Sequence, residues 1–288
     1  MHIPTKTLKS GFSMPVFGLG TWHMGGDFHR DLSNNDAADS AAIERAIDAG
    51  ITHIDTAEIY AEGHAEELVG TAIRGRKRED LFLVSKVSWR HAGSDDILRA
   101  IEGSLKRLGV SYLDLYLLHK PNPTVPLKET MRAMDLLQEQ GLIRNIGVSN
   151  FAPERLKRAQ QYATHPVVVN QVHYNLKIRE PERKGLLTYC QQHDVLLAAW
   201  RPVQGLEEAS TVLLLQKLAR KYEKTPMQIA LNWLLSQSNV VTLAKMKAAE
   251  HLQENLGAIG WQMEVEDIEI LRAEFPGQHD VSDAVELH

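Results

Sequence analysis

Hydrophobic and polar positions form two kinds of block that alternate along this chain. Short, continuous apolar runs such as Leu81 to Val84 and Val167 to Val169 are typical of strands buried on both faces of a sheet. Longer segments between them carry apolar residues at helical spacing, as Ile43, Ala46 and Ile47 do. The pattern therefore predicts strands and helices in regular alternation.

Eight strands follow from these runs. We predict them at residues 17–22, 51–56, 81–86, 112–118, 143–148, 167–172, 195–200 and 240–244. We predict helices at residues 36–49, 65–73, 94–108, 126–140, 153–161, 182–193, 211–222, 226–236, 249–257 and 266–274. Eight buried strands that alternate with helices predict an α/β fold of the (β/α)8 TIM barrel type.

Three segments lie outside this repeat. Residues 6–17 are expected to form an N-terminal β-hairpin, with its turn at Ser10-Gly11. The helix at 266–274 is an extra C-terminal helix, and residues 276–288 are a short polar tail. Because no linker-like segment divides the chain, we expect a single barrel domain over residues 1–288. The alternative is an open doubly wound sheet, but no Gly-x-Gly-x-x-Gly motif follows the first strand.

Composition narrows the function classes. The 288 residues are 43% hydrophobic and 24% charged, with a net charge of −5, so a nucleic-acid-binding surface is not indicated. Neither a signal sequence nor a membrane span is apparent, and we expect no membrane partner. Cys190 is the single cysteine, which excludes a disulfide framework and a cysteine-rich zinc site. We therefore expect a cytoplasmic protein without a metal.

Four polar residues stand at or just beyond the ends of consecutive predicted strands. They are Asp55, Tyr60, Lys86 and His119. In a barrel of this kind the active site lies at the carboxyl ends of the strands, so these side chains are expected to meet. An ammonium beside a phenol lowers the high phenol pKa of about 10, and a carboxylate holds the ammonium in place. A histidine nearby hydrogen-bonds the oxygen that receives the proton, so the set predicts a general acid for carbonyl reduction.

Each of these residues has an ordinary alternative when taken alone. Asp55 is suited to a turn, Tyr60 to packing, Lys86 to a solvated strand end and His119 to a barrel rim. The coincidence of all four at strand ends favours the catalytic interpretation. None of the four transfers a hydride, so the chemistry requires a cofactor.

Several segments of the chain resemble the aldo-keto reductase family. They are Gly18-Leu19-Gly20-Thr21-Trp22, Asp55-Thr56-Ala57-Glu58-Ile59-Tyr60, Val84-Ser85-Lys86-Val87, Leu117-Leu118-His119, Gly147-Val148-Ser149-Asn150-Phe151, Asn170-Gln171 and Leu252-Gln253-Glu254-Asn255. They occur in the family's order over about residues 8 to 275. The resemblance implies NADPH-dependent reduction of aldehydes or ketones, with Asp55, Tyr60, Lys86 and His119 as the catalytic tetrad and Tyr60 as the acid.

The resemblance also implies a cofactor site. Ser149, Asn150 and Gln171 match the residues that bind the nicotinamide carboxamide, and Thr21 belongs to the first matching segment. Trp200 stands where the family usually has a tyrosine stacked on the nicotinamide. Lys245 matches the lysine that pairs with the adenosine 2′-phosphate, and Asn255 matches the residue that binds adenine.

Three positions depart from the family pattern near the cofactor. Arg201 replaces a serine, so it either contacts phosphate or extends into solvent. Met246 replaces another serine, and His251 stands where an arginine commonly holds the 2′-phosphate. A neutral imidazole is a poorer phosphate partner than the bidentate guanidinium of arginine, although Lys247 offers a substitute. We expect NADPH to be preferred over NADH by a smaller margin than is usual in the family, with NADH remaining an alternative.

The substrate pocket is expected at the same rim. Trp22, Trp89 and Lys120 are assigned to it, with His23 and Met24 as further candidates. Lys120 occupies a position where the family often has tryptophan, which favours polar or anionic carbonyl compounds unless the lysine is simply solvated. Because the tail is short, we expect an open, permissive pocket that takes a small aldehyde or ketone. The protein is expected to be a monomer.

Two other functions fit the same residues. A Schiff-base aldolase would use Lys86 as its nucleophile, but that chemistry needs a lowered lysine pKa, and Asp55 would raise it. A NADP(H)-binding regulatory subunit is the non-enzymatic alternative, because a fold does not fix a function. The intact set of four polar residues favours the reductase.

Overall fold

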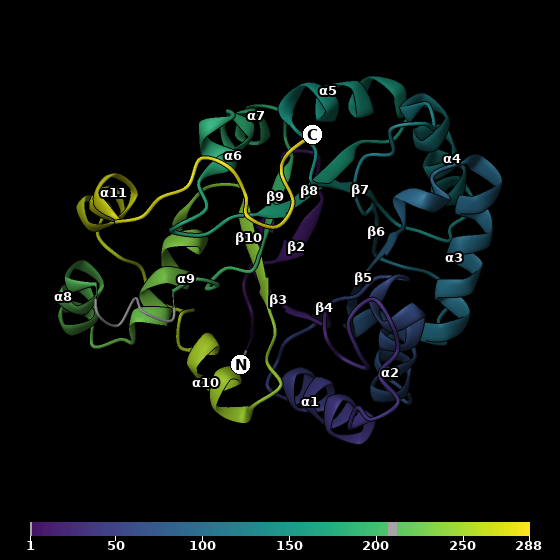
Figure 1. The fold of residues 1–288 in the computed structure, drawn as a ribbon. Helices are drawn as coiled ribbons and strands as arrows, with labels where there is room; N and C mark the ends of the chain where they lie inside the picture. The colour runs from purple at the N-terminus through teal and green to yellow at the C-terminus, as the bar shows by residue number, and fades with distance from the viewer. Residues whose placement is uncertain (1, 207–211) are drawn as a thin grey trace.

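The computed structural model describes residues 2–206 and 212–288. At its centre, eight parallel strands close into a barrel in the order β10-β3-β4-β5-β6-β7-β8-β9 (Figure 1). The barrel strands are β3 (Phe17–Gly20), β4 (His53–Asp55), β5 (Phe82–Val87), β6 (Leu115–Leu118), β7 (Ile146–Ser149), β8 (Val167–His173), β9 (Leu196–Trp200) and β10 (Val240–Ala244). This topology confirms the predicted (β/α)8 barrel.

Helices surround the barrel on its outer side (Figure 1). They are α1 (Asp36–Asp48), α2 (His64–Ala72), α3 (Ser94–Leu108), α4 (Leu127–Glu139), α5 (Pro153–Tyr162), α6 (Glu180–Arg183), α7 (Leu186–Gln192), α8 (Leu213–Tyr222), α9 (Pro226–Ser236), α10 (Ala249–Leu256) and the extra C-terminal helix α11 (Val265–Glu274). Short 3-10 turns also occur at Tyr60–Gly63, Arg78–Asp80 and Trp89–His91.

One predicted helix is wrong. The segment 182–193 is not continuous, because Gly185 has a φ of 72° and separates α6 from α7. Glycine adopts this left-handed conformation without steric cost, and the chain turns there. The segment predicted at 211–222 begins at a residue outside the described part, and α8 starts at Leu213.

The amino end of the barrel is closed by the N-terminal hairpin. Strands β1 (Thr5–Thr7) and β2 (Ser13–Pro15) pair antiparallel, within the range predicted for the hairpin. Met14 is fully buried and packs with Leu8 against Val84 and Leu115. The hairpin therefore closes the amino end of the barrel with apolar side chains, and the carboxyl end is the one where a binding site is expected.

The C-terminal tail packs across the carboxyl side of the barrel. His279 forms a bridge with Ile178, and the backbone N–H of Leu287 donates to Glu180 Oε1 at 3.0 Å. The carbonyl of His288 accepts a hydrogen bond from the N–H of Ala152 at 2.8 Å. These contacts fix a segment that the sequence suggested only as a short polar tail.

Candidate active site

A cavity of about 1000 Å3 opens at the carboxyl end of the barrel. It is lined by residues of the strand ends, the loops beyond them, α9, α10 and the C-terminal tail. All of the assigned site residues line this cavity except Lys86 and Thr21, and of the further candidates Met24 and Lys247 do not line it. The strand ends therefore converge as the alternation of strands and helices predicted.

Lys86 lies directly beneath the cavity and joins two other members of the predicted tetrad. Its Nζ donates to Asp55 Oδ1 at 2.5 Å, to the carbonyl of Thr56 at 2.9 Å and to the Tyr60 hydroxyl at 3.2 Å. Asp55 and Lys86 are buried, at 1% and 0% exposure. A buried ion pair is tolerated only when its remaining groups are hydrogen-bonded. Gln171 meets that need, because its Nε2 donates to Asp55 Oδ2 at 2.7 Å.

The ion pair sets the charge states of Lys86 and Tyr60. Burial lowers the pKa of Lys86, but Asp55 and Tyr60 raise it more, so the amine has a pKa above its usual 10.5. Burial raises the pKa of Tyr60, and the Lys86 ammonium lowers it by less, so the net pKa lies above 10.0. The expectation of a lowered phenol pKa was wrong, because burial outweighs the cation here. At neutral pH the phenol keeps its proton and the amine is charged.

His119 stands across the cavity from Tyr60. The two ring centroids are 5.6 Å apart and the rings are nearly perpendicular. Burial, followed by the charges of Lys86 and Lys120, lowers the pKa of His119 well below 6.5. The imidazole is therefore neutral at pH 7, and its Nδ1 is buried without a hydrogen-bond partner among the described residues.

Ser149, Asn150 and Gln171 form a polar group on the ends of β7 and β8. Asn150 Nδ2 donates to Ser149 Oγ at 3.0 Å and to the carbonyl of His119 at 3.1 Å. Ser149 Oγ donates to the carbonyl of Gln171 at 2.7 Å. Asn150 Oδ1 is buried without a partner among the described residues, and Asn150 has a φ of 63°. A left-handed asparagine with an unpaired acceptor is typical of a ligand-binding position.

Trp200 provides a flat aromatic wall of the cavity. His173 stacks on the Trp200 ring at 4.4 Å between centroids. Ser282 Oγ of the tail and His173 Nδ1 share a hydrogen bond of 2.9 Å, and burial lowers the pKa of His173 to about 4. The tail thus supports Trp200 through a neutral histidine, and nothing in the local sequence signals this contact.

Arg201 turns the chain after β9. It has a φ of 54°, and its carbonyl accepts a hydrogen bond from Asn175 Nδ2 at 2.8 Å. Its guanidinium lies 5.3 Å from the Trp200 ring centroid and lines the cavity. Both alternatives drawn from the sequence stay open, because the residue lines the cavity and is also exposed.

The far end of the cavity carries Lys245, His251 and Asn255. Burial and Lys247 lower the pKa of Lys245, while Asp39 opposes this. Lys247 does not line the cavity, because its Nζ bonds Asp39 Oδ1 and the carbonyl of His23, both at 2.7 Å. The suggestion that Lys247 substitutes for a phosphate-binding arginine is therefore not supported. Met246 is buried at 1% exposure.

Aromatic residues form the mouth of the cavity near Tyr60 and His119. Trp22 lies 4.9 Å from the Tyr60 ring, and Trp89 lies 6.5 Å from the His119 ring, both between centroids. Lys120 Nζ lies 3.5 Å from the centroid of Trp89. His23 lines the cavity, but Met24 is fully buried in the core, so its assignment was wrong.

The predicted residues and the residues that line the cavity differ in two further respects. Thr21 does not line the cavity, because its hydroxyl donates to the carbonyl of Asp55 at 3.0 Å and thereby fixes the end of β4. Sequence reasoning missed apolar lining residues, among them Phe28, Ile59, Met227, Ala284 and Val285. Only their place after strand ends or on the tail would have signalled them.

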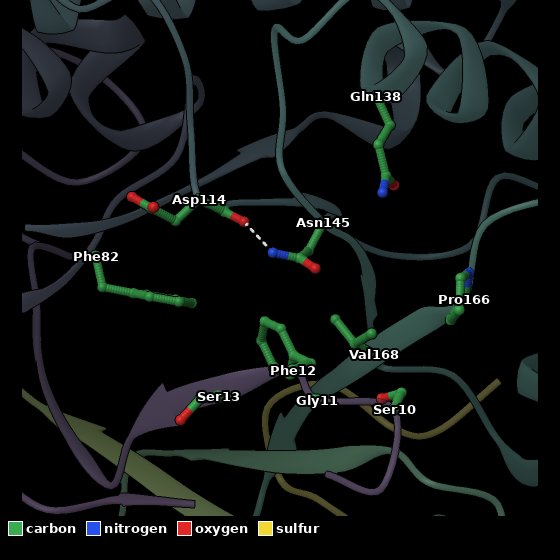
Figure 2. A pocket seen from close by; sticks show the side chains of 10 residues that line it. All are labelled: Ser10, Gly11, Phe12, Ser13, Phe82, Asp114, Gln138, Asn145, Pro166 and Val168. Carbon is green, nitrogen blue, oxygen red and sulfur yellow. Dashed lines mark hydrogen bonds between the residues drawn. The ribbon is translucent and has the colours of Figure 1, made fainter. Parts of the chain in front are cut away.

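A second cavity, of about 530 Å3, lies at the amino end of the barrel (Figure 2). It lies between the hairpin loop and the residues that begin strands, with Phe12, Phe82 and Val168 among its walls. Its one acid, Asp114, accepts bonds from Arg78 at 2.6 Å and from the N–H of Leu83 at 2.8 Å. The Asp114 ion pair is completed by a backbone group, whereas the ion pair at the carboxyl end also reaches the Tyr60 hydroxyl.

Among the described residues, no group of three or more His, Cys, Asp or Glu is placed to hold a metal ion. Across residues 2–206 and 212–288, no helix is long and apolar enough to cross a membrane.

Known proteins resemble this chain over nearly its whole length. The model of the aldo/keto reductase family matches residues 16–273. The methylglyoxal reductase YeaE of Escherichia coli (strain K12) is 35% identical over 269 residues, which cover 92% of each chain. A thermostable aldo-keto reductase crystallised with the inhibitor epalrestat is 45% identical with a TM-score of 0.90, over 94% of this chain and 99% of the other.

An aldo-keto reductase of Klebsiella pneumoniae crystallised with NADPH is 36% identical with a TM-score of 0.82, over 98% of each chain. The matched segment contains every residue of the predicted tetrad. The fold, the geometry of the cavity and these matches agree: the chain belongs to the aldo/keto reductase family.

Proposed function

We propose that this protein reduces small aldehydes and ketones to alcohols with NADPH, and that Tyr60 protonates the carbonyl oxygen. The observation that carries the proposal is the buried Lys86, which contacts both Asp55 and the hydroxyl of Tyr60. A charged lysine held there by a carboxylate serves to stabilise a phenolate that forms during reaction.

The residues of the cavity fit a nicotinamide cofactor. The unpaired Oδ1 of Asn150 is an acceptor that matches the N–H groups of a carboxamide. Trp200 offers an aromatic face for a planar ring, and Lys245 and Arg201 bring positive charge to the same cavity. NADPH bound in this cavity would supply the hydride that the side chains lack.

The side chains divide the remaining chemistry. His119, neutral because of its burial, orients the carbonyl oxygen by a hydrogen bond, and Tyr60 then gives its proton to that oxygen. Lys86 stabilises the resulting phenolate, while Asp55 and Gln171 keep the ammonium in place. Hydride addition to the carbonyl carbon and proton transfer to its oxygen together give the alcohol, and solvent restores the Tyr60 proton.

Cofactor choice follows from the far end of the cavity. Lys245 is a cation suited to the adenosine 2′-phosphate, whereas His251 is a weaker partner than arginine. We therefore expect NADPH to bind more tightly than NADH. Because His251 replaces an arginine, we expect the difference between the two affinities to be smaller than is usual in the family.

The substrate class is supported by the relatives and by the cavity. A relative named as a methylglyoxal reductase points to small dicarbonyl compounds. The walls at the mouth combine Trp22 and Trp89 with Lys120, so short polar and aromatic aldehydes both fit. We expect activity over a broad panel rather than selectivity for one bulky ketone.

The rival functions are less well supported. An aldolase needs a lysine with a lowered pKa, but the pKa of Lys86 is raised by Asp55. A purely regulatory subunit has no need of the buried contact between Lys86 and Tyr60. We therefore keep the reductase as the proposal.

The test is the rate of NADPH oxidation with methylglyoxal and aromatic aldehydes, in the wild type and in Tyr60→Phe. Loss of the general acid is expected to lower kcat by about 10²- to 10⁴-fold. Tyr162→Phe, on the exposed side of α5, is the matched control and is expected to keep full activity. Retention of wild-type reduction by Tyr60→Phe, with a normal melting temperature, would contradict the assignment.

The proposal also includes a monomer working in the cytoplasm. The single cysteine, Cys190, is buried and burial raises the pKa of its thiol to about 12, which suits a thiol kept reduced. Light scattering of the purified protein would test the monomer, and an activity that depends on protein concentration would contradict it.

A further inference from the structure

Lys120 is a cation at the mouth of the cavity, and it has no anionic partner among the described residues. It directly follows His119 and its Nζ lies 3.5 Å from the centroid of Trp89. Burial and the neighbouring Arg90 lower its pKa, and no acid of the described residues acts in the other direction. Within residues 2–206 and 212–288, the charged side chain that acts on Lys120 is therefore another cation.

The loop that carries Lys120 is held in place by side-chain hydrogen bonds. Asn122 Nδ2 donates to the carbonyl of Trp89 at 2.5 Å. Asn122 Oδ1 accepts from the N–H groups of Thr124 at 2.6 Å and Val125 at 2.7 Å. These bonds hold the loop after Lys120 against the backbone of Trp89, whose ring contacts the ammonium of Lys120.

The acids that line the same cavity are already engaged. Asp55 is neutralised by Lys86, and Glu254 Oε1 accepts a hydrogen bond from Thr225 Oγ1 at 2.7 Å. Neither acts on Lys120, and no other acid of the described residues does, so Lys120 is available to an anionic group of a bound molecule. Because Lys120 adjoins His119, that anion belongs near the carbonyl that His119 orients.

We infer that Lys120 determines substrate specificity by selecting carbonyl compounds that also carry a carboxylate, such as aldehyde acids and keto acids. The inference rests on the proposed reductase function and deepens it. The ammonium on Trp89 meets the carboxylate, while the carbonyl of the same molecule faces Tyr60 and His119. Lys120 takes no part in the proton transfer and acts on binding.

The test compares two aldehydes of nearly equal shape, 4-carboxybenzaldehyde and the neutral 4-nitrobenzaldehyde. The measured quantity is the ratio of their kcat/KM values with NADPH, which is then compared between proteins so that intrinsic reactivity cancels. Lys120→Met removes the charge but keeps a long apolar stem on Trp89. Lys120→Arg keeps the charge, and Lys128→Met, on the exposed face of α4, removes a lysine outside the cavity.

A partly exposed ion pair is expected to change the ratio by about two- to fivefold. Lys120→Met should lower the ratio by that factor, mainly through a higher KM for the carboxylate, while Lys120→Arg and Lys128→Met should retain it. An unchanged ratio in Lys120→Met overturns the inference. If the wild type reduced neither aldehyde with NADPH, the proposed function would fail instead, so the two failures are distinguishable.

Discussion

The two ends of the barrel use polar groups differently. At the amino end, Asp114 Oδ2 accepts from Arg78 and from a backbone N–H, beside a cavity walled partly by Phe12 and Phe82 (Figure 2). At the carboxyl end, Lys86 of the buried pair with Asp55 also donates to the hydroxyl of Tyr60, which lines the cavity. An ion pair whose further contact is a backbone group is structural, whereas one that also reaches a proton donor is prepared for chemistry.

The ends differ because of the direction of the strands. All eight strands of the barrel are parallel, so their carboxyl ends and the loops that follow gather on one side. Loops can vary in residue type without disturbing the apolar barrel interior, while the amino end is filled by Leu8 and Met14 of the hairpin segment. Function is therefore concentrated at one end and packing at the other.

The largest expected effect is on the free energy of unfolding, when Asp55 at the carboxyl end and Asp114 at the amino end are each replaced by asparagine. Asp55→Asn leaves the buried ammonium of Lys86 without its counterion, which is expected to cost about 3–5 kcal/mol of unfolding free energy. Activity with NADPH should fall with it, because Lys86 loses its fixed position. Asp114→Asn, where both ion-pair side chains are partly exposed, should cost only about 1–3 kcal/mol.

Urea unfolding and steady-state rates on both variants check this prediction. Asp114→Asn is expected to keep the wild-type kcat. If Asp114→Asn lowered kcat as much as Asp55→Asn, the functional difference between the two ends would be refuted.

A smaller effect concerns His53, which lies between the two ends. It is two residues before Asp55 on β4, its ring is 5.8 Å from that of Phe82, and neither ring nitrogen has a hydrogen-bond partner among the described residues. Burial lowers its pKa from 6.5 to about 4, with Asp55 opposing and Lys86 adding to the shift. Because the folded pKa is depressed, the contribution to stability is present above pH 6.5 and is lost as the pH falls from 6.5 towards 4.

The loss at pH 5.0 relative to pH 7.5 is on the order of 2 kcal/mol for this one group. In His53→Gln the pH dependence of the unfolding free energy should be smaller by that amount, as measured by urea titrations at both values. His2→Gln, at an exposed position, serves as the control. An identical pH dependence in wild type and His53→Gln would show that His53 is not held neutral.

The smallest effect separates the two lysines after β10. Lys245→Met should weaken NADPH binding by about tenfold and leave NADH binding unchanged, because only NADPH carries the phosphate that pairs with the ammonium. Lys247→Met is the matched control, since Lys247 is engaged by Asp39 and does not line the cavity. Fluorescence titration with both cofactors measures this, and equal or tighter NADH binding by the wild type would contradict the cofactor preference.

Local patterns in the sequence determined the barrel and much of the site. Continuous apolar runs mark strands buried on both faces, and a polar residue after each run marks a strand end, so Asp55, Lys86, His119 and Ser149 were placed correctly on one side. The pattern of apolar residues indicates where each strand ends. Because the strands are parallel, those ends lie on the same side of the barrel.

Tertiary structure alone decided the contacts that tune the site. Gln171 reaches Asp55 across 116 residues, Ser282 supports Trp200 through His173, and burial raises the pKa of Tyr60 against the effect of Lys86. Each depends on the distance between segments remote in the chain, or on how completely water is excluded. The local pattern of residues determines neither this distance nor the exclusion of water, because both arise only when the barrel closes and the tail packs over it.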